Sequence, residues 1–150
     1  MRVLLAYLQK FEGNAEFPIK EVKDLLVIEK LHKILENENE MAGELARLSL
    51  SILTQISFSF PQEVARHNTK KIVSLCDGTS STDLRTQEAA VRLICNLLTE
   101  EVSRDLVIKS DGLFGIFHCL INNNKAALKY ALACLLNLTF LTNVKSSNII

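Results

Sequence analysis

The chain has 150 residues, which suffices for one domain or for a few small repeats that share one core. Apolar residues make up 48% and charged residues 23%, a composition that argues against a globally disordered chain. The net charge of zero argues against a nucleic-acid partner, and the five glycines and two prolines favour long helices over a turn-rich β architecture.

The first segment, residues 1–17, places Arg2 before a short apolar run. The run is too short for a signal peptide and lacks a cleavage-site pattern, so we expect an N-terminal helix that acts as a cap or belongs to a degenerate repeat. The most apolar segment, residues 130–141, also falls short of the roughly 20 residues that span a bilayer. We therefore expect no membrane partner.

A period of 41 residues organises the rest of the chain. Gln55, Asn96 and Asn137 are 41 residues apart, and each lies in an apolar run. Because apolar residues three apart share one face of a helix, three aligned columns of them predict a long amphipathic helix in each of three units. The columns are Leu50, Val91 and Leu132; Leu53, Ile94 and Leu135; Ile56, Leu97 and Leu138.

Two shorter helices are predicted ahead of each long one. The first elements read FPIKEVKDLLV, FPQEVARHNT and EEVSRDLVIKSDG, and the prolines of the first two suit the first position of a helix. The second elements read IEKLHKIL, TKKIVSLC and DGLFGIFHCL, and each is followed by helix breakers. The predicted units are therefore residues 18–59, 60–100 and 101–142, and residues 143–150 look like the start of a truncated fourth repeat.

This pattern resembles the armadillo repeat, whose unit has a short first helix, a second helix and a longer third helix with an Asn-Leu signature. The best match is SDGLFGIFHCLINNNKAALKYALACLLNLT, in which Asp111-Gly112 stands where the family usually has Gly-Gly. Residues 18–142 carry the resemblance; HEAT repeats, the nearest confusable family, have two-helix units. The resemblance implies an all-α fold. It would be a single domain of residues 1–150, forming an armadillo-like right-handed superhelix (α-solenoid) of about three three-helix repeats plus an N-terminal helix.

The resemblance also implies a binding groove. In the family, the asparagine of the third helix faces a concave surface and can hold a bound peptide's backbone, because its amide both donates and accepts hydrogen bonds. The groove candidates here are Gln55, Arg92, Asn96, Tyr130 and Asn137. The amides have an alternative role, which is to bond a neighbouring helix and tie the repeats together.

The chemistry of the ligand follows from Arg92 and Tyr130, which lie one and two turns ahead of their asparagines and favour an acidic or aromatic-bearing segment. The family's nuclear-import adaptors use tryptophans to bind lysine-rich signals. This chain has no Trp, so we do not expect that specificity.

The cysteines and histidines give little sign of catalysis. The four cysteines each lie in an aliphatic segment without a CxxC pair, which favours reduced core residues over two disulfides. The three histidines are scattered, and neither a phosphate-binding loop nor a dinucleotide-binding motif is present. We therefore expect no catalytic residues, no metal, no cofactor and no small-molecule substrate, in a protein of the cytoplasm, with the nucleus as the alternative.

The function expected from the sequence is a non-enzymatic scaffold or adaptor that binds a partner protein or an extended peptide along the groove. An alternative is a regulator of a nucleotide-cycling enzyme such as a small GTPase, which rests on analogy of fold alone. Because a solenoid normally has a polar capping repeat, we also expect either a fragment of a longer solenoid or a partner that covers the last helix.

Overall fold

The structure is a computed structural model, which describes residues 26–36, 42–67, 69–77, 83–122 and 124–147. Over these residues the fold is all-α, with eight helices and no strand, as the sequence predicts. The predicted N-terminal helix of residues 1–17 and nearly all of the first element of the first unit lie outside the described residues. The helices are α3 (Val27–Glu36), α4 (Ala42–Ser57), α5 (Pro61–Arg66), α6 (Thr69–Asp77), α7 (Leu84–Leu97), α8 (Glu101–Lys109), α9 (Gly112–Ile121) and α10 (Lys125–Ser147).

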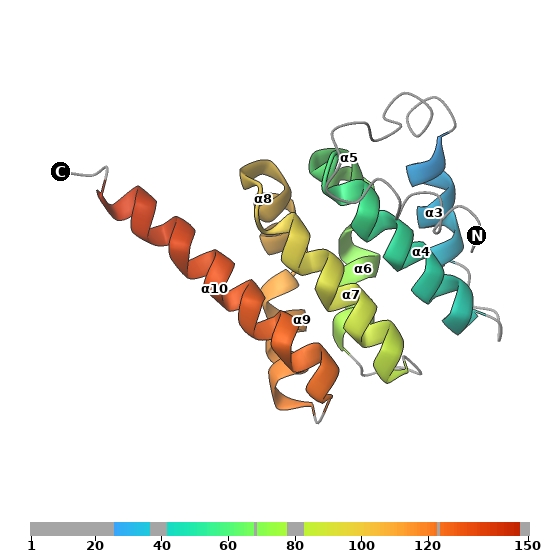
Figure 1. Ribbon diagram of the computed structural model, residues 1–150. Helices are drawn as coiled ribbons and strands as arrows, with labels where there is room; N and C mark the ends of the chain where they lie inside the picture. Colours follow the sequence, from blue (N-terminus) through green and yellow to red (C-terminus); the bar gives the residue numbers. More distant parts are fainter. Residues whose placement is uncertain (1–25, 37–41, 68, 78–82, 123, 148–150) are drawn as a thin grey trace.

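The helices follow one another in a recurring order of lengths. Two short helices, α5 and α6, precede the long helix α7, and the short helices α8 and α9 precede the long helix α10. The long helices α4, α7 and α10 lie side by side and run in the same direction (Figure 1). The short helices contact their equivalents in the same way, α3 with α6, α6 with α9 and α5 with α8. Each helix therefore packs against the helix that lies one period away in the sequence.

The core lies between these helices, and the predicted apolar columns fill it. The column residues of α4 and α7 are all buried. In α10 the columns behave differently, since Leu132 is 53% exposed although its equivalent on α7, Val91, is 0% exposed. The reason is that α7 has a long helix on each side, whereas α10 has a long helix on one side only within the described part of the chain.

Residues of α7 that contact α10 have equivalents one period later, on the outer face of α10. On α7, the backbone oxygens of Val91 and Cys95 accept hydrogen bonds from the side chains of Cys134 and Asn137. The residues of α10 that are equivalent to Gln87, Val91 and Cys95 are apolar and exposed. They are Leu128, Leu132 and Leu136.

A close contact explains the Asp-Gly pair between α8 and α9. Gly112 begins α9 directly against α8, and a Cβ at this position would lie 2.4 Å from Val107 Cγ1 and 2.7 Å from the Val107 carbonyl oxygen. No side chain fits there. The preceding residue, Asp111, takes the left-handed turn with φ of 63°.

Residues 143–147 continue α10 without a break, across the predicted boundary between the third unit and a fourth. Despite this length, no helix in the described ranges combines the length and the apolar character needed to cross a bilayer.

Substitutions at equivalent positions of α7 and α10 test this packing. We expect Val91→Ala to lower the free energy of unfolding by about 2 kcal/mol, because a fully buried side chain loses two methyl groups. Leu132→Ala removes a larger group but should cost less than about 0.5 kcal/mol, because the side chain is half exposed. Urea denaturation followed by circular dichroism measures both. An equal or larger cost at Leu132 would contradict the placement of α10.

Candidate functional site

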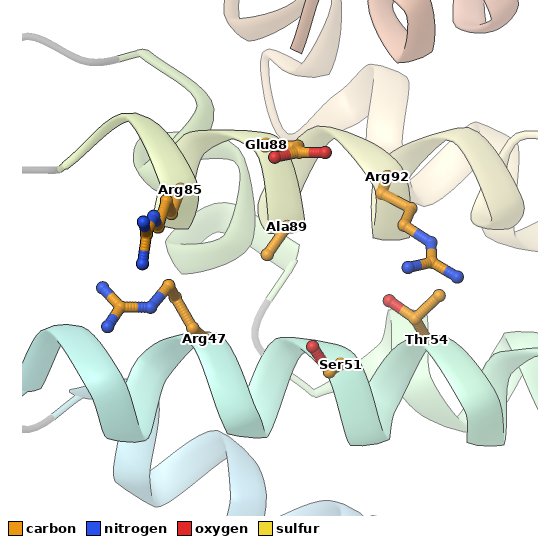
Figure 2. A pocket seen from close by; sticks show the side chains of 7 residues that line it. All are labelled: Arg47, Ser51, Thr54, Arg85, Glu88, Ala89 and Arg92. Carbon is orange, nitrogen blue, oxygen red and sulfur yellow. The ribbon is translucent and has the colours of Figure 1, made fainter. Parts of the chain in front are cut away.

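A pocket lies in the groove between α4 and α7, with a volume of about 210 Å³. Both long helices contribute to it, so it belongs to the face that these helices form (Figure 2). Its lining combines small or polar side chains with four charged ones. The lining residues are Arg47, Ser51, Thr54, Arg85, Glu88, Ala89 and Arg92.

The charge of the pocket is mainly positive, with three arginines against Glu88. The guanidinium groups of Arg47 and Arg85 point toward each other across the groove, and Arg92 extends from α7 toward Thr54 (Figure 2). Arginine keeps its charge at all physiological pH values, and its planar fork of N–H donors matches a carboxylate or phosphate. The arrangement is therefore suited to an anionic group placed between the arginines.

Asp83 fixes one edge of the pocket. It is the N-cap of α7, and its Oδ1 accepts hydrogen bonds from the backbone N–H groups of Arg85 and Thr86 at 2.9 and 3.0 Å. Its Oδ2 lies 3.0 Å from Arg47 Nη1, which joins α4 to the start of α7. Burial acts to raise the pKa of Asp83, but hydrogen bonds from Thr86, the charge of Arg47 and the Arg85 N–H outweigh it, so the pKa is lowered. The carboxylate stays charged and positions the Arg47 guanidinium at the rim.

Arg92 connects the pocket to α10. Its Cζ lies 6.0 Å from the ring centroid of Tyr130, at the outer range of a cation–π contact. On α10 itself, Lys129 Nζ lies 4.7 Å from the same centroid. The two predicted groove residues Arg92 and Tyr130 are thus brought together, and the cationic surface extends over all three long helices.

Gln55, Asn96 and Asn137 form a ladder of amides, one in each predicted unit, and this ladder lies beside the pocket rather than in it. Asn137 Nδ2 donates a hydrogen bond to the carbonyl oxygen of Cys95 at 3.2 Å, and Asn96 Nδ2 lies 3.5 Å from Ser57 Oγ. Each asparagine therefore reaches back to the preceding long helix with its N–H group. Both are partly exposed, and within the described residues their Oδ1 atoms accept no hydrogen bond.

Gln55 differs from the two asparagines although it shares their register. Its side chain is only 6% exposed, so little of its amide is available at the surface. It does not line the pocket.

Sequence reasoning found part of the pocket. It named Arg92 as a groove residue, and Arg92 lines the pocket, whereas the other four groove candidates do not. It missed Arg47 and Arg85, which lie eight and eleven residues ahead of the ladder. Those spacings also fall on one face of a helix, so the signal was present and could have been read.

Within the described residues, no group of three or more His, Cys, Asp or Glu side chains is placed to hold a metal ion. His118 is adjacent to Cys119 in the sequence, but its contact is with α6. His118 Nδ1 lies 2.6 Å from Asp77 Oδ1.

The contribution of the two asparagines to the free energy of unfolding can be measured by comparing Asn137→Ala with Asn96→Ala. We expect Asn137→Ala to lower the free energy of unfolding by about 1 kcal/mol, the usual net contribution of one hydrogen bond. The longer contact of Asn96 should contribute less than half of this. Urea denaturation of both variants gives the comparison, and a larger cost at Asn96 would show that the contacts of the ladder are misassigned.

Comparison of the chain with protein-family models, with curated proteins and with solved structures finds no match. The site is therefore interpreted from its own geometry and charge.

Proposed function

We propose that the protein is a non-enzymatic binding module that holds an acidic, extended segment of a partner protein on the face of α4, α7 and α10. One observation carries this proposal. Three arginines converge on a pocket between two long helices, against Glu88 in the lining and Asp83 at the edge, where Asp83 is paired with Arg47. In a chain whose net charge is zero, such a local excess of positive charge favours an anionic partner.

The proposed architecture is an armadillo-like right-handed superhelix. Three features support it: the 41-residue period, the recurring order of two short helices and one long helix, and the packing of each helix on its equivalent one period away. In such a superhelix the third helix of each unit lines the concave surface. That surface would be formed here by α4, α7 and α10, which are the helices that carry the arginines and Tyr130.

The spacing of the arginines sets the spacing of the charges that they can bind. Arg85 and Arg92 are seven residues apart on α7, which corresponds to about 10 Å along the helix axis at about 1.5 Å per residue. A polyproline-type extended peptide rises about 3.1 Å per residue and returns to the same side every three residues. Two carboxylates three positions apart are therefore about 9 Å apart, and one can reach the Arg47–Arg85 pair while the other reaches Arg92.

The asparagines would add backbone contacts. Their Oδ1 atoms are not used by the described residues, and each is a suitable acceptor for an N–H group of a bound peptide. The amide then serves both roles suggested by the sequence, because its N–H group ties the repeats together and its oxygen faces the ligand.

The proposal is tested with a fluorescent peptide that carries Asp or Glu at every third position, compared with the matched Asn and Gln peptide. We expect the acidic peptide to bind more tightly and to lose affinity as salt rises. Arg85→Glu and Arg92→Glu should each weaken binding at least about tenfold, which corresponds to about 1.4 kcal/mol. Fluorescence anisotropy gives the dissociation constants.

Arg66→Glu is the matched control, because Arg66 is an exposed arginine on α5 that lies outside the pocket and bonds only Gln62 on its own helix within the described residues. Its affinity for the acidic peptide should stay close to that of the unmodified protein. If Arg66→Glu weakened binding as much as Arg92→Glu, the effect would come from net charge and the pocket would not be the site. Equal binding of both peptides would reject an acidic ligand.

A further inference from the structure

The four cysteines are free thiols, and they are arranged as two pairs across one boundary. Cys76 of α6 and Cys119 of α9 are neighbours, and Cys119 Sγ donates to the Cys76 carbonyl oxygen at 3.3 Å. Cys134 Sγ of α10 lies 3.8 Å from the Val91 carbonyl oxygen, one turn before Cys95 on α7, and Asn137 Nδ2, one turn after Cys134, lies 3.7 Å from Cys95 Sγ. These two contacts place Cys95 and Cys134 beside each other between α7 and α10. Each pair joins a helix of the second predicted unit to its equivalent in the third.

The two pairs differ in access to solvent. Cys76, Cys119 and Cys134 are buried, whereas Cys95 is partly exposed. Asn137 Nδ2 lies 3.7 Å from Cys95 Sγ, which places a hydrogen-bond donor beside this sulfur and would favour its thiolate form. Cys95 is thus the partly exposed member of the four cysteines, and Cys134 is its neighbour on the adjacent helix.

The contact between the two thiols shifts their pKa values in opposite directions. The Cys134 thiol lowers the pKa of Cys95, although burial acts in the opposite direction. The contact with Cys95 and then burial raise the pKa of Cys134. Both shifts arise from the contact between the two thiols, so the order of reaction rests on the partial exposure of Cys95.

We infer that Cys95 and Cys134 form a redox-modification site, which a hydroperoxide converts to a disulfide between α7 and α10. Accessible thiols beside a second cysteine are the usual targets of such oxidation. Cys95 would react first because it is the exposed member, and Cys134 would resolve the product because it already lies against Cys95 and needs no access to solvent.

The chemistry takes two steps. The Cys95 thiolate attacks one oxygen of hydrogen peroxide, the O–O bond breaks, and the departing hydroxide takes up a proton to become water. Cys95 is then a sulfenic acid. The Cys134 sulfur attacks the Cys95 sulfur, the S–S bond forms, and the hydroxyl group leaves as water with the Cys134 proton. Two thiols and one peroxide give one disulfide and two waters, and two electrons pass from the sulfurs to the peroxide.

The disulfide would fasten the helix that is least covered. Within the described residues α10 packs on α7 and α9 but leaves Leu132 and Leu136 exposed. A covalent bond from Cys134 to α7 restricts the unfolded chain and so stabilises this attachment. It also lies one turn from Asn137, whose amide contacts both the backbone oxygen and the sulfur of Cys95.

The test is oxidation of the reduced, folded protein with hydrogen peroxide, followed by mass spectrometry. Trypsin separates all four cysteines, since Arg85, Arg92, Arg104, Lys109, Lys125 and Lys129 lie between them. We expect the intact mass to fall by two hydrogens, the peptides that contain Cys95 and Cys134 to be joined, the melting temperature to rise, and dithiothreitol to reverse each change.

Two variants separate the steps. Cys134→Ser removes the resolving thiol, so oxidation should stop at the Cys95 sulfenic acid, which dimedone traps. Cys76→Ser removes one member of the buried pair and should leave the Cys95–Cys134 disulfide intact. Circular dichroism of each variant before oxidation checks that it is folded.

Three results would overturn the inference. The first is a folded, oxidised protein in which Cys95 keeps its free thiol. The second is a disulfide that forms first between Cys76 and Cys119. The third is a dimedone adduct, in the Cys134→Ser variant, on a cysteine other than Cys95. If Cys134→Ser does not fold, the peptide map of the unmodified protein decides, because its joined peptides identify the pair directly.

Discussion

The arrangement depends on α7 being buried on two sides. This helix of 14 residues packs against α4 on one side and α10 on the other, so most of its surface has to be apolar or paired. Each fully buried aliphatic side chain contributes about 1.5–3 kcal/mol, and α7 supplies several to both neighbours. The polar side chains of α7 that stay exposed or partly exposed lie in one strip, Arg85, Glu88, Arg92 and Asn96, at spacings of three and four. The candidate site is therefore the face of α7 that packing leaves free.

Polar contacts fix how the second and third units fit together. Asn124, at the start of α10, donates to the Leu84 carbonyl oxygen at 2.8 Å and to Gln87 Oε1 at 2.9 Å. Gln87 in turn donates to the Cys76 carbonyl oxygen at 2.9 Å. These buried groups are satisfied in one register only, because a shift of one turn would leave them unpaired at a cost of about 1–3 kcal/mol each. The Gln87 contact also fixes the backbone at Cys76, one member of the buried cysteine pair.

The sequence predicted the helices and the buried stripes of α4 and α7, since both follow from local periodicity. The expectation that a partner or a further repeat covers the last helix already implied an exposed apolar stripe there, and Leu132 is 53% exposed while Val91 is buried. The periodic pattern alone did not show this, because it identifies the apolar side of a helix and not whether another element covers it. The cysteine pairs were hidden for a related reason. Cys95 and Cys134 are 39 residues apart, not 41, and their contact depends on how neighbouring helices are offset.

The central claim is that, among the described helices, α7 has a long helix on both sides and α10 on one side. Native-state hydrogen exchange tests this claim most directly. Amides of α7 should exchange only when the whole protein unfolds, so their opening free energy should equal the free energy of global unfolding. Amides in α10 around Leu132 and Leu136 should exchange through smaller, local openings, because this stretch leaves apolar side chains exposed. Equal protection of α10 and α7, or local opening of α7 at lower free energy than α10, would contradict the account.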